Sequence, residues 1–364
     1  MAPSAVETVT QEAEKLLGKT DKTEKTDGPA QTEQQIPKEV YKSHREPLKL
    51  SGALDRFRQF DVTPVIGREF VDVDLAEWLR APNSDELLRD LAITVSRRGV
   101  VFFRKQDNIS DDLQKELVQR LGELSGKPET SKLHIHPLNN SGREDGSKDD
   151  EISVISSVQA KKLFSKSLGF STTQSLKDTL WASGYELYDR ISPPLRGFLE
   201  TLVAHFAQPG FQKSAEKNNF KLHPGPRGAP ENVGEILEAF QPVIRTNPVT
   251  GWKSVYAVGH HVASIVGLSE AESKHFLDWF LQILTESHDI QVRLRWQNVN
   301  DVAIWDNRSV YHAATPDYID DEDLGERKGS RSVSLGERPY LDPQSVSRRE
   351  GLAAEKAAAS NGKA

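Results

Sequence analysis

Stretches with helical hydrophobic spacing and stretches with strand-like spacing alternate irregularly along the middle of this chain. Leucines and a valine recur at helical spacing up to Gly99, and the apolar run 100–103 that follows has the composition of a buried strand. A chain built from βαβ units would alternate strands and helices regularly. We therefore predict a mainly β fold with flanking helices, of the α+β class, with a largely antiparallel core.

Helix start signals and the alternation of apolar and polar residues locate the other helices and strands. Ser269 with Glu272 has the spacing of a capping box, in which two side chains satisfy free backbone N–H groups at a helix start, and Asn83 begins the same pattern. A Ser-Pro pair at 192–193 also opens a helical pattern. Helices are thus predicted after Asn83, over 111–121, over 193–206 and after Ser269, and strands over 290–296, 302–305 and 333–335.

Polar composition separates both ends of the chain from this core. Residues 1–47 contain one aromatic residue and a run, 18–28, without any apolar side chain, so they bury too little apolar surface to fold. Residues 345–364 are similarly polar and end in alanine, lysine and glycine. We predict disordered tails over 1–47 and 345–364, the second at most a frayed helix, one domain over 48–344, and a surface loop in the polar stretch 139–151.

Charge and the lack of cysteine exclude several classes of function. With 47 Lys and Arg against 54 Asp and Glu, the net charge is −7, whereas a nucleic-acid binder has a basic face. Without Cys there is no disulfide, iron–sulfur cluster or thiolate, so any metal must be held by His, Asp or Glu. No apolar run reaches the roughly 18 residues of a membrane span, and no signal peptide opens the sequence. We expect a soluble, cytoplasmic protein with neither a membrane nor a nucleic-acid partner.

Three residues near the end of the domain are candidates for a binding site. His312 follows a predicted strand and can be a metal ligand, and Arg327 and Arg331 can each hold an anion through two parallel hydrogen bonds. The alternative is that His312 is a hydrogen-bonded core histidine and both arginines are surface charges. Spacing alone favours this alternative.

Five segments in order carry further motifs: Leu133–Pro137, Asp178–Gly184, Pro242–Gly251, Ile265–Ser273 and Ile304–Arg308. Together they resemble the taurine/alpha-ketoglutarate dioxygenase (TauD/TfdA) family, and most closely its fungal sulfonate dioxygenases. The resemblance implies a double-stranded β-helix (jelly roll) in which two His and one carboxylate hold Fe(II) on one face of the metal. It also implies 2-oxoglutarate as co-substrate, O2 and a small anionic substrate such as a sulfonate, and it is compatible with a homo-oligomer.

The resemblance assigns roles to single residues. His312 resembles the distal iron ligand, and Arg327 resembles the arginine that pairs with the far carboxylate of 2-oxoglutarate. Thr179 resembles the threonine that hydrogen-bonds the same carboxylate. His136 and Arg331 resemble the pair that binds the sulfonate of the substrate.

The family's proximal iron ligands, a His and an Asp two residues apart, have no counterpart in this chain. That spacing directs both side chains to one face of a strand, and the resemblance puts it between the predicted strand 152–155 and Asp178. Residues 161–177 contain neither His nor Asp. Because two strands with their connections need on the order of 20–30 residues, we infer that a block is missing and that the jelly roll is incomplete by about two strands.

Other residues offer weaker ligand sets. His134 and His136 would share one face of a strand and with His312 would make a three-His site, but the family pattern assigns this segment to the substrate. The other pairs lie in the polar tail, on a predicted outer helix or next to each other: His44 with Glu46, His275 with Asp278, and His260 with His261. With His312 as the single strong ligand, we expect impaired Fe(II) binding.

Two functions are therefore open. In the first, the protein is an Fe(II)/2-oxoglutarate-dependent dioxygenase that acts on a sulfonate such as taurine and releases sulfite, succinate and CO2. In the second, it is a catalytically inactive relative, either an aberrant product or a small-anion binder, that keeps the anion-binding residues. The missing carboxylate ligand discriminates between the two.

Overall fold

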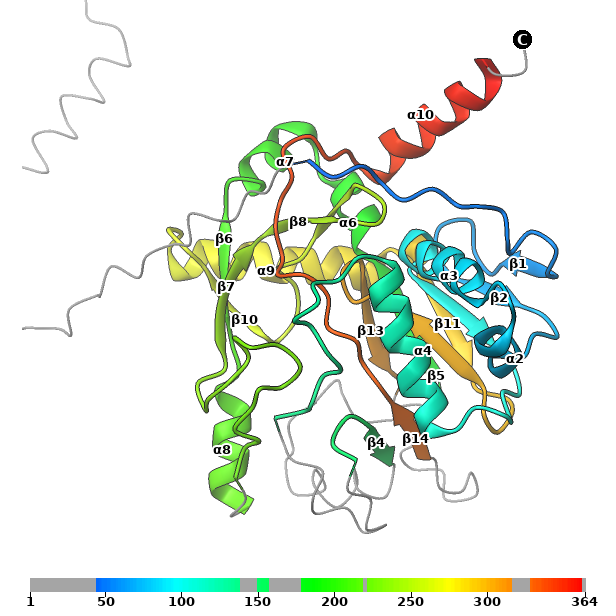
Figure 1. Ribbon diagram of the computed structural model, residues 1–364. Coiled ribbons are helices and arrows are strands. Elements are labelled where there is room, and N and C mark those ends of the chain that lie inside the picture. The colour runs from blue at the N-terminus through cyan, green and yellow to red at the C-terminus, as the bar shows by residue number, and fades with distance from the viewer. Residues whose placement is uncertain (1–43, 138–148, 157–177, 219–220, 316–327, 362–364) are drawn as a thin grey trace, which may run out of the picture. The chain divides into compact units, whose positions relative to one another are not determined.

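The N-terminal part of the described chain builds three helices on one face of a four-stranded sheet (Figure 1). Val101 and Phe103 of the central strand pack under these helices with Phe70 and Leu91, because alternate side chains of a strand point to the same face. The sheet has the order β1 (Gln59–Asp61), β2 (Arg68–Phe70), β3 (Val100–Phe103), β12 (Val302–Trp305), and the helices are α2 (Leu75–Arg80), α3 (Ser84–Arg98) and α4 (Asp111–Leu124). The structure, a computed structural model, describes residues 44–137, 149–156, 178–218, 221–315 and 328–361, all within one compact unit.

The other face of this sheet packs against a second, three-stranded sheet. Phe102 and Val100 of the first sheet join Trp181 and Val292 of the second in one buried cluster, in which the rings of Phe102 and Trp181 are 5.5 Å apart. In this sheet His312 pairs directly with Trp181, so His312 lies on the same inner face. The sheet has the order β11 (Gln291–Arg295), β5 (Asp178–Ser183), β13 (Val310–Ala314), with both pairings antiparallel.

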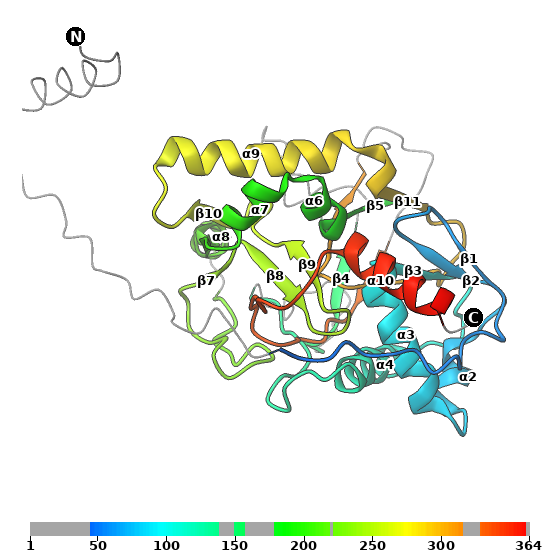
Figure 2. The same ribbon diagram turned by 90° about the horizontal axis from the view of Figure 1, so that it is seen from above.

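A further hydrophobic cluster forms under the long helix α9. Phe280 and Leu284 of this helix pack with Leu187 and Val255. Figure 2 shows α9 along one side of the sheets and α3 and α4 along the opposite side. The elements around this cluster are α6 (Gly184–Arg190), α7 (Pro193–Leu199), α9 (Glu270–Glu286), the pair β8 (Ile244–Asn247) and β9 (Trp252–Val255), and the sheet β10 (Val262–Ile265), β6 (Val203–Ala207), β7 (Glu238–Pro242).

Four smaller elements complete the described chain. β4 (Ser153–Ser156) pairs with β14 (Lys328–Arg331), and α8 (Pro209–Asn218) follows β6. The helix α10 (Arg348–Asn361) is attached at its start by Arg348, which donates to Glu186 at 2.7 Å. The segment 345–364, expected to be a disordered tail or at most a frayed helix, is helical from Arg348 to Asn361. Arg348 in its first turn is buried, which composition alone did not reveal.

A buried charge network fixes the turn between β12 and β13. The Asp306 carboxylate accepts hydrogen bonds from Ser96 Oγ at 2.8 Å, Asn247 Nδ2 at 3.0 Å and Arg308 Nε at 2.8 Å. Arg308 in turn donates to Glu337 at 3.3 Å. Burial opposes ionisation of Asp306, but the Arg308 charge and these donors outweigh it and hold its pKa well below the usual range. The network thus sets the turn from which strand β13 carries His312.

Most of the expected elements are confirmed, with three corrections. The predicted helix 193–206 ends at Leu199, because Val203–Ala207 pairs with strands on both sides as β6. Residues 333–335 form no strand, and Ser334 makes only an isolated bridge with Leu133. The capping box is present at Ser269, whereas Asn83 makes no capping hydrogen bond.

Several expectations concern residues outside the described ranges. These are the tail over 1–47, apart from 44–47, most of the loop 139–151, and the whole segment 161–177. Across the ranges that the structure describes, none of the helices is both long and apolar enough to cross a membrane.

Candidate anion-binding site

His312 lies on the inner face of the second sheet, next to two tryptophans. Its ring is 5.0 Å from that of Trp305, which is in turn 5.7 Å from Trp181. The His312 side chain is exposed, yet the protein around it lowers its pKa to about 4, with desolvation as the larger cause and the Arg331 charge as the second. Because the side chain is exposed, a ligand can reach this neutral imidazole.

Thr179 shares this inner face with His312. It is opposite Ala314 in the register that pairs His312 with Trp181, so both side chains point into the same layer. The Thr179 side chain is buried, and its hydroxyl accepts a hydrogen bond of 3.1 Å from Trp296 Nε1. Its own O–H can still donate to a ligand. Arg327, the predicted partner of the same co-substrate, lies outside the described residues.

Arg331 ends strand β14, where it pairs with Ser153 of β4. Its Nε atom is buried without a hydrogen-bond partner, and burial lowers its pKa. An arginine stays charged in a protein, and a buried charge without a partner is costly. In the described part of the chain no carboxylate pairs with Arg331, and burial is the one cause of its lowered pKa. This arginine is therefore suited to bind an anion.

His134 and His136 come from a segment that runs beside the end of β14. The backbone N–H of His134 donates to Val333 at 2.8 Å, two residues beyond Arg331. The two imidazole rings are 6.2 Å apart. Desolvation, followed by the charges of His136, Arg331 and Arg227, lowers the pKa of His134 to about 4. His134 is therefore neutral at pH 7 and can donate or accept a hydrogen bond.

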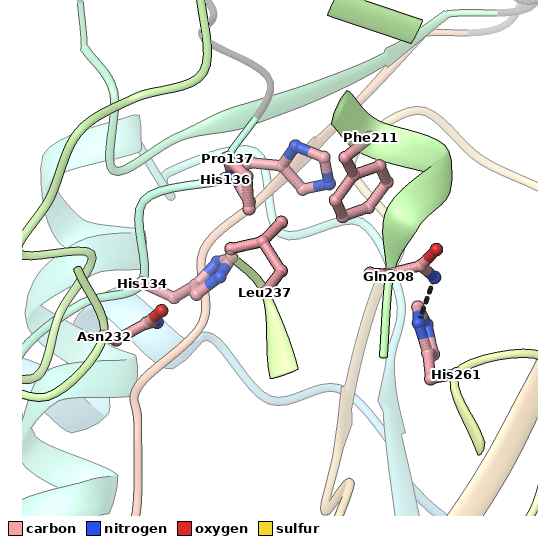
Figure 3. A pocket seen from close by; sticks show the side chains of 8 residues that line it. All are labelled: His134, His136, Pro137, Gln208, Phe211, Asn232, Leu237 and His261. Carbon is pink, nitrogen blue, oxygen red and sulfur yellow. Dashed lines mark hydrogen bonds between the residues drawn. The ribbon is translucent and has the colours of Figure 1, made fainter. Parts of the chain in front are cut away.

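Next to these histidines a cavity of about 330 Å³ opens between β6, α8 and the segment 221–237 (Figure 3). Phe211 contributes an apolar wall, and its ring is 5.3 Å from His136. Gln208 Nε2 donates to His261 Nδ1 on the side of the cavity away from His134 in Figure 3. The lining residues are His134, His136, Pro137, Gln208, Phe211, Asn232, Leu237 and His261.

A second buried arginine organises one wall of this cavity. Arg227 is 1% exposed and donates from Nη1 to the carbonyl oxygens of His223 at 2.7 Å and Gly234 at 2.9 Å. Its Nε donates to Asn232 Oδ1 at 3.2 Å. Burial lowers its pKa. Arg227 thus holds the loop that carries Asn232, and it adds positive charge close to His134.

The residues that the structure describes do not form the iron site of the resemblance. No group of three His, Cys, Asp or Glu side chains among them could hold a metal ion. The three-His alternative of His134, His136 and His312 is therefore wrong. His44 pairs with Asp342 at 2.8 Å, which gives it a structural role. The donors among the described residues therefore do not fit the family's Fe(II), and residues 157–177, which lie outside the described ranges, contain no His, Asp or Glu in the sequence.

Sequence reasoning named His136, Arg331 and His312, and their roles stay predictions. The Arg331 charge acts on both His134 and His312. Sequence reasoning missed Arg227 and the Gln208–His261 pair. Arg227 lies in a Gly- and Pro-rich stretch that is typical of a surface loop, and no sequence signal distinguishes it.

The fold is that of a mainly β protein with flanking helices, and its cavity is lined by polar and apolar side chains beside His134 and His136. A family model described as "Taurine catabolism dioxygenase TauD, TfdA family" matches residues 177–332, which include Thr179, His312 and Arg331. The alpha-ketoglutarate-dependent dioxygenase btcD of Neocamarosporium betae is 48% identical over 84% of this chain and 98% of its own. This chain belongs to the TauD/TfdA family of alpha-ketoglutarate-dependent dioxygenases.

More distant relatives agree with this assignment. The alpha-ketoglutarate-dependent sulfonate dioxygenase of Saccharomyces cerevisiae is 29% identical over 85% of this chain and 77% of its own length. A crystal structure of a taurine dioxygenase from Burkholderia xenovorans has a TM-score of 0.54 and 23% identity, and the match covers 79% of this chain and 94% of that one. This likeness supports the mainly β fold with helices.

The alignment with btcD contains positions that this chain leaves empty. It runs over 344 positions but takes up 84% of this chain, and 84% of 364 residues is fewer than 344. The relative therefore has residues at positions where this chain has none.

Proposed function

We propose that the protein binds a small organic anion at Arg331, in the substrate pocket of an alpha-ketoglutarate-dependent dioxygenase. The observation that carries this proposal is the partly buried Arg331 side chain, whose buried Nε has no hydrogen-bond partner. A planar guanidinium forms strong charge-assisted hydrogen bonds with sulfonates and carboxylates. His136, which lines the cavity, is the proposed second contact of the anion.

A sulfonate is the head group that we favour. The Saccharomyces cerevisiae relative is named as a sulfonate dioxygenase. The neutral His134 and the cationic Arg331 are both suited to the oxygens of a tetrahedral anion. For 2-oxoglutarate, the proposed contacts are the Thr179 hydroxyl and Arg327, with O2 as the second co-substrate of the family's reaction.

We further propose that this chain has lost the segment with the proximal iron ligands. The positions left empty in the alignment with btcD support this loss. So does the absence of His, Asp and Glu from residues 157–177. On this view the jelly roll is short of about two strands, and iron-dependent turnover is impaired.

Turnover is the competing candidate, because 48% identity with a dioxygenase over 98% of that relative's length favours a common reaction. Iron binding decides between the two. We expect the purified protein, loaded with Fe(II) under anaerobic conditions and desalted, to keep much less than one iron per chain. Metal analysis and 2-oxoglutarate-dependent succinate release measure this directly.

The btcD protein, treated identically, is the positive control for this experiment. Stoichiometric iron in the present chain, together with succinate release at a rate comparable with that of the control, would refute the impairment. The anion site at Arg331 would be unaffected by that outcome.

Binding of 2-oxoglutarate should be weak because only one end of the molecule is held. We expect a Kd in the millimolar range, since the far carboxylate retains Arg327 and Thr179 but the keto-acid end lacks its metal. A thousandfold loss relative to a micromolar complex corresponds to about 4 kcal/mol. Arg327→Ala should abolish the remaining signal in calorimetry, and an unchanged signal would contradict the role of Arg327.

A further inference from the structure

The loop 223–234 closes on itself at both ends, and we call it the clamp loop. Arg227 Nη1 donates to the carbonyl oxygens of its first and last residues, His223 and Gly234. The Gly234 N–H also donates to the Pro224 carbonyl at 2.9 Å. Compact surface loops whose ends lie together are frequently functional. Arg227 is therefore the residue that closes this loop.

Asn232 completes the closure from within the loop. Arg227 Nε donates to Asn232 Oδ1, the Arg227 N–H donates to the Asn232 carbonyl at 2.9 Å, and Asn232 Nδ2 returns a hydrogen bond of 3.2 Å to the Arg227 carbonyl. In the ranges that the structure describes, no carboxylate forms an ion pair with this arginine. Because a buried charge without an ionic partner destabilises the fold, its presence indicates a role other than stability.

The clamp loop is bonded to both ends of the segment 132–137, which carries two histidines of the candidate site. The Lys132 N–H donates to the Gly228 carbonyl at 2.6 Å, and the His223 N–H donates to the Pro137 carbonyl at 2.7 Å. These two bonds lie on either side of the histidines. The loop therefore fixes the backbone from which both imidazole side chains extend.

The loop and the segment approach each other most closely at Gly228. Its φ of +93° lies in the left-handed region, and a Cβ atom there would be 2.5 Å from the Leu133 carbonyl oxygen. Atoms that are not bonded attract each other at about 3.5–4.0 Å, so no side chain fits between the two backbones. Both the backbone conformation and this contact require glycine.

The opposite edge of the segment 132–137 is bonded to the chain that follows β14. The His134 N–H donates to the Val333 carbonyl at 2.8 Å, and the Leu335 N–H donates to the Lys132 carbonyl at 3.1 Å. With the clamp loop on one edge and this chain on the other, the segment has little freedom to move.

We propose that Arg227 is a positioning residue for the ligand: it closes the clamp loop, and the loop fixes the segment 132–137 so that His136 faces the anion. This inference rests on the proposed anion site, in which His136 is the second contact. Groups that bind a ligand have to be held to within about 0.5 Å by the residues behind them. The clamp loop provides this support without touching the anion.

Replacing Arg227 tests the closure of the loop. Arg227→Met keeps the length of the side chain but none of its hydrogen bonds, and we expect it to lower the affinity for hexanesulfonate about tenfold in calorimetry. Arg227→Lys keeps the charge but not the planar fork, so it should recover no more than about twofold of this loss. Full recovery by lysine would mean that the charge of Arg227 acts on the anion directly, and the positioning role would be wrong.

Gly228→Ala tests the contact between loop and segment without changing Arg227. The added Cβ atom pushes the loop away from Leu133, so the affinity should fall by about five- to tenfold. Gly267→Ala is the matched control, because Gly267 has a similar φ of +83° but none of the described atoms lies within 4 Å of the added Cβ. It should bind hexanesulfonate as the unchanged protein does. Equal losses in both variants would mean that backbone strain is the cause, which contradicts the clamp.

Amide hydrogen exchange measures the positioning itself. In Arg227→Met and Gly228→Ala, the N–H groups of Lys132 and His134 should exchange at least about tenfold faster. The N–H groups of strand β3 should exchange as before, because local release of the segment affects only the first set. Faster exchange in both sets would show a loss of overall stability and would refute the positioning role.

A double-mutant cycle and the Arg331 variant separate this inference from the anion site on which it rests. In the His136→Ala background, Arg227→Met should change the affinity by less than about twofold, since the residue that it positions is gone. An undiminished loss in that background refutes positioning through His136. If Arg331→Met weakens binding but Arg227→Met and Gly228→Ala do not, the anion site stands and the positioning role is refuted. If the unchanged protein binds no hexanesulfonate, or if Arg331→Met has no effect, the anion site itself is refuted.

Discussion

Replacing Arg331 by methionine is expected to weaken binding of hexanesulfonate by about a hundredfold, which corresponds to about 2.7 kcal/mol. Methionine keeps most of the length and packing of the side chain but has no donor and no charge. The loss includes the charge-assisted hydrogen bonds to the anion, which are about twice as strong as neutral ones. Titration calorimetry or ligand-observed NMR measures the change.

The same substitution should leave the free energy of unfolding unchanged or slightly higher. Arg331 is partly buried without a carboxylate partner in the described chain, so it costs the folded state free energy instead of supplying it. A side chain with a structural role would lose binding and stability together. Denaturant unfolding therefore distinguishes a ligand-binding arginine from a structural one.

Two further variants test whether Arg331 makes a specific contact with the anion. Arg331→Lys keeps the charge but not the planar fork, so it should recover only part of the affinity. Arg338→Met removes an exposed arginine seven residues further on and should leave binding unchanged. Equal losses in Arg331→Met and Arg338→Met would mean that general positive charge, and not a specific contact, attracts the anion.

Local sequence patterns predicted the elements whose structure follows from the spacing of their own apolar residues. The strand 100–103 and the helix that ends at Gly99 follow directly from apolar periodicity and from a glycine with a positive φ of 76°. The pattern failed after Leu199, where apolar residues fit a helix and a strand equally well. There the pairing of β6 with β7 and β10 decides the structure, and no local signal contains that information.

The residues of the candidate site also divide into those that sequence motifs indicated and those that only the fold brings together. The resemblance to a family named His136, Arg331 and His312, because each lies in a motif that can be read along the chain. The contact of Gln208 with His261 became visible only in the fold, since the two come from separate segments that β6 and β10 bring together. The sequence offered His261 only as a neighbour of His260, and composition and spacing gave no reason to pair it with Gln208.

Replacing Asp306 by alanine is expected to lower the free energy of unfolding by about 3–5 kcal/mol. The carboxylate is buried and bound to Ser96, Asn247 and Arg308. Its removal leaves the Arg308 charge with Glu337 as its remaining ionic partner and three groups without an acceptor. Asp278→Ala is the matched control, because Asp278 pairs with Lys274 on the exposed surface of α9 and should change stability by less than about 0.5 kcal/mol. Urea unfolding of both variants measures the difference.

The contribution of the Asp306 charge to the free energy of unfolding should also decrease as the pH falls. Burial opposes the ionised form, but Arg308 and the hydrogen-bond donors hold the folded-state pKa well below the unfolded value of about 3.9. A depressed pKa stabilises the fold above the unfolded pKa, and this stabilisation is lost as the pH falls toward the folded one. The difference in unfolding free energy between the unchanged protein and Asp306→Asn should therefore be constant from pH 7 to pH 5 and shrink below about pH 4. A difference that instead grows on acidification would mean that Asp306 is protonated in the native network and that the turn carrying His312 is held by neutral hydrogen bonds.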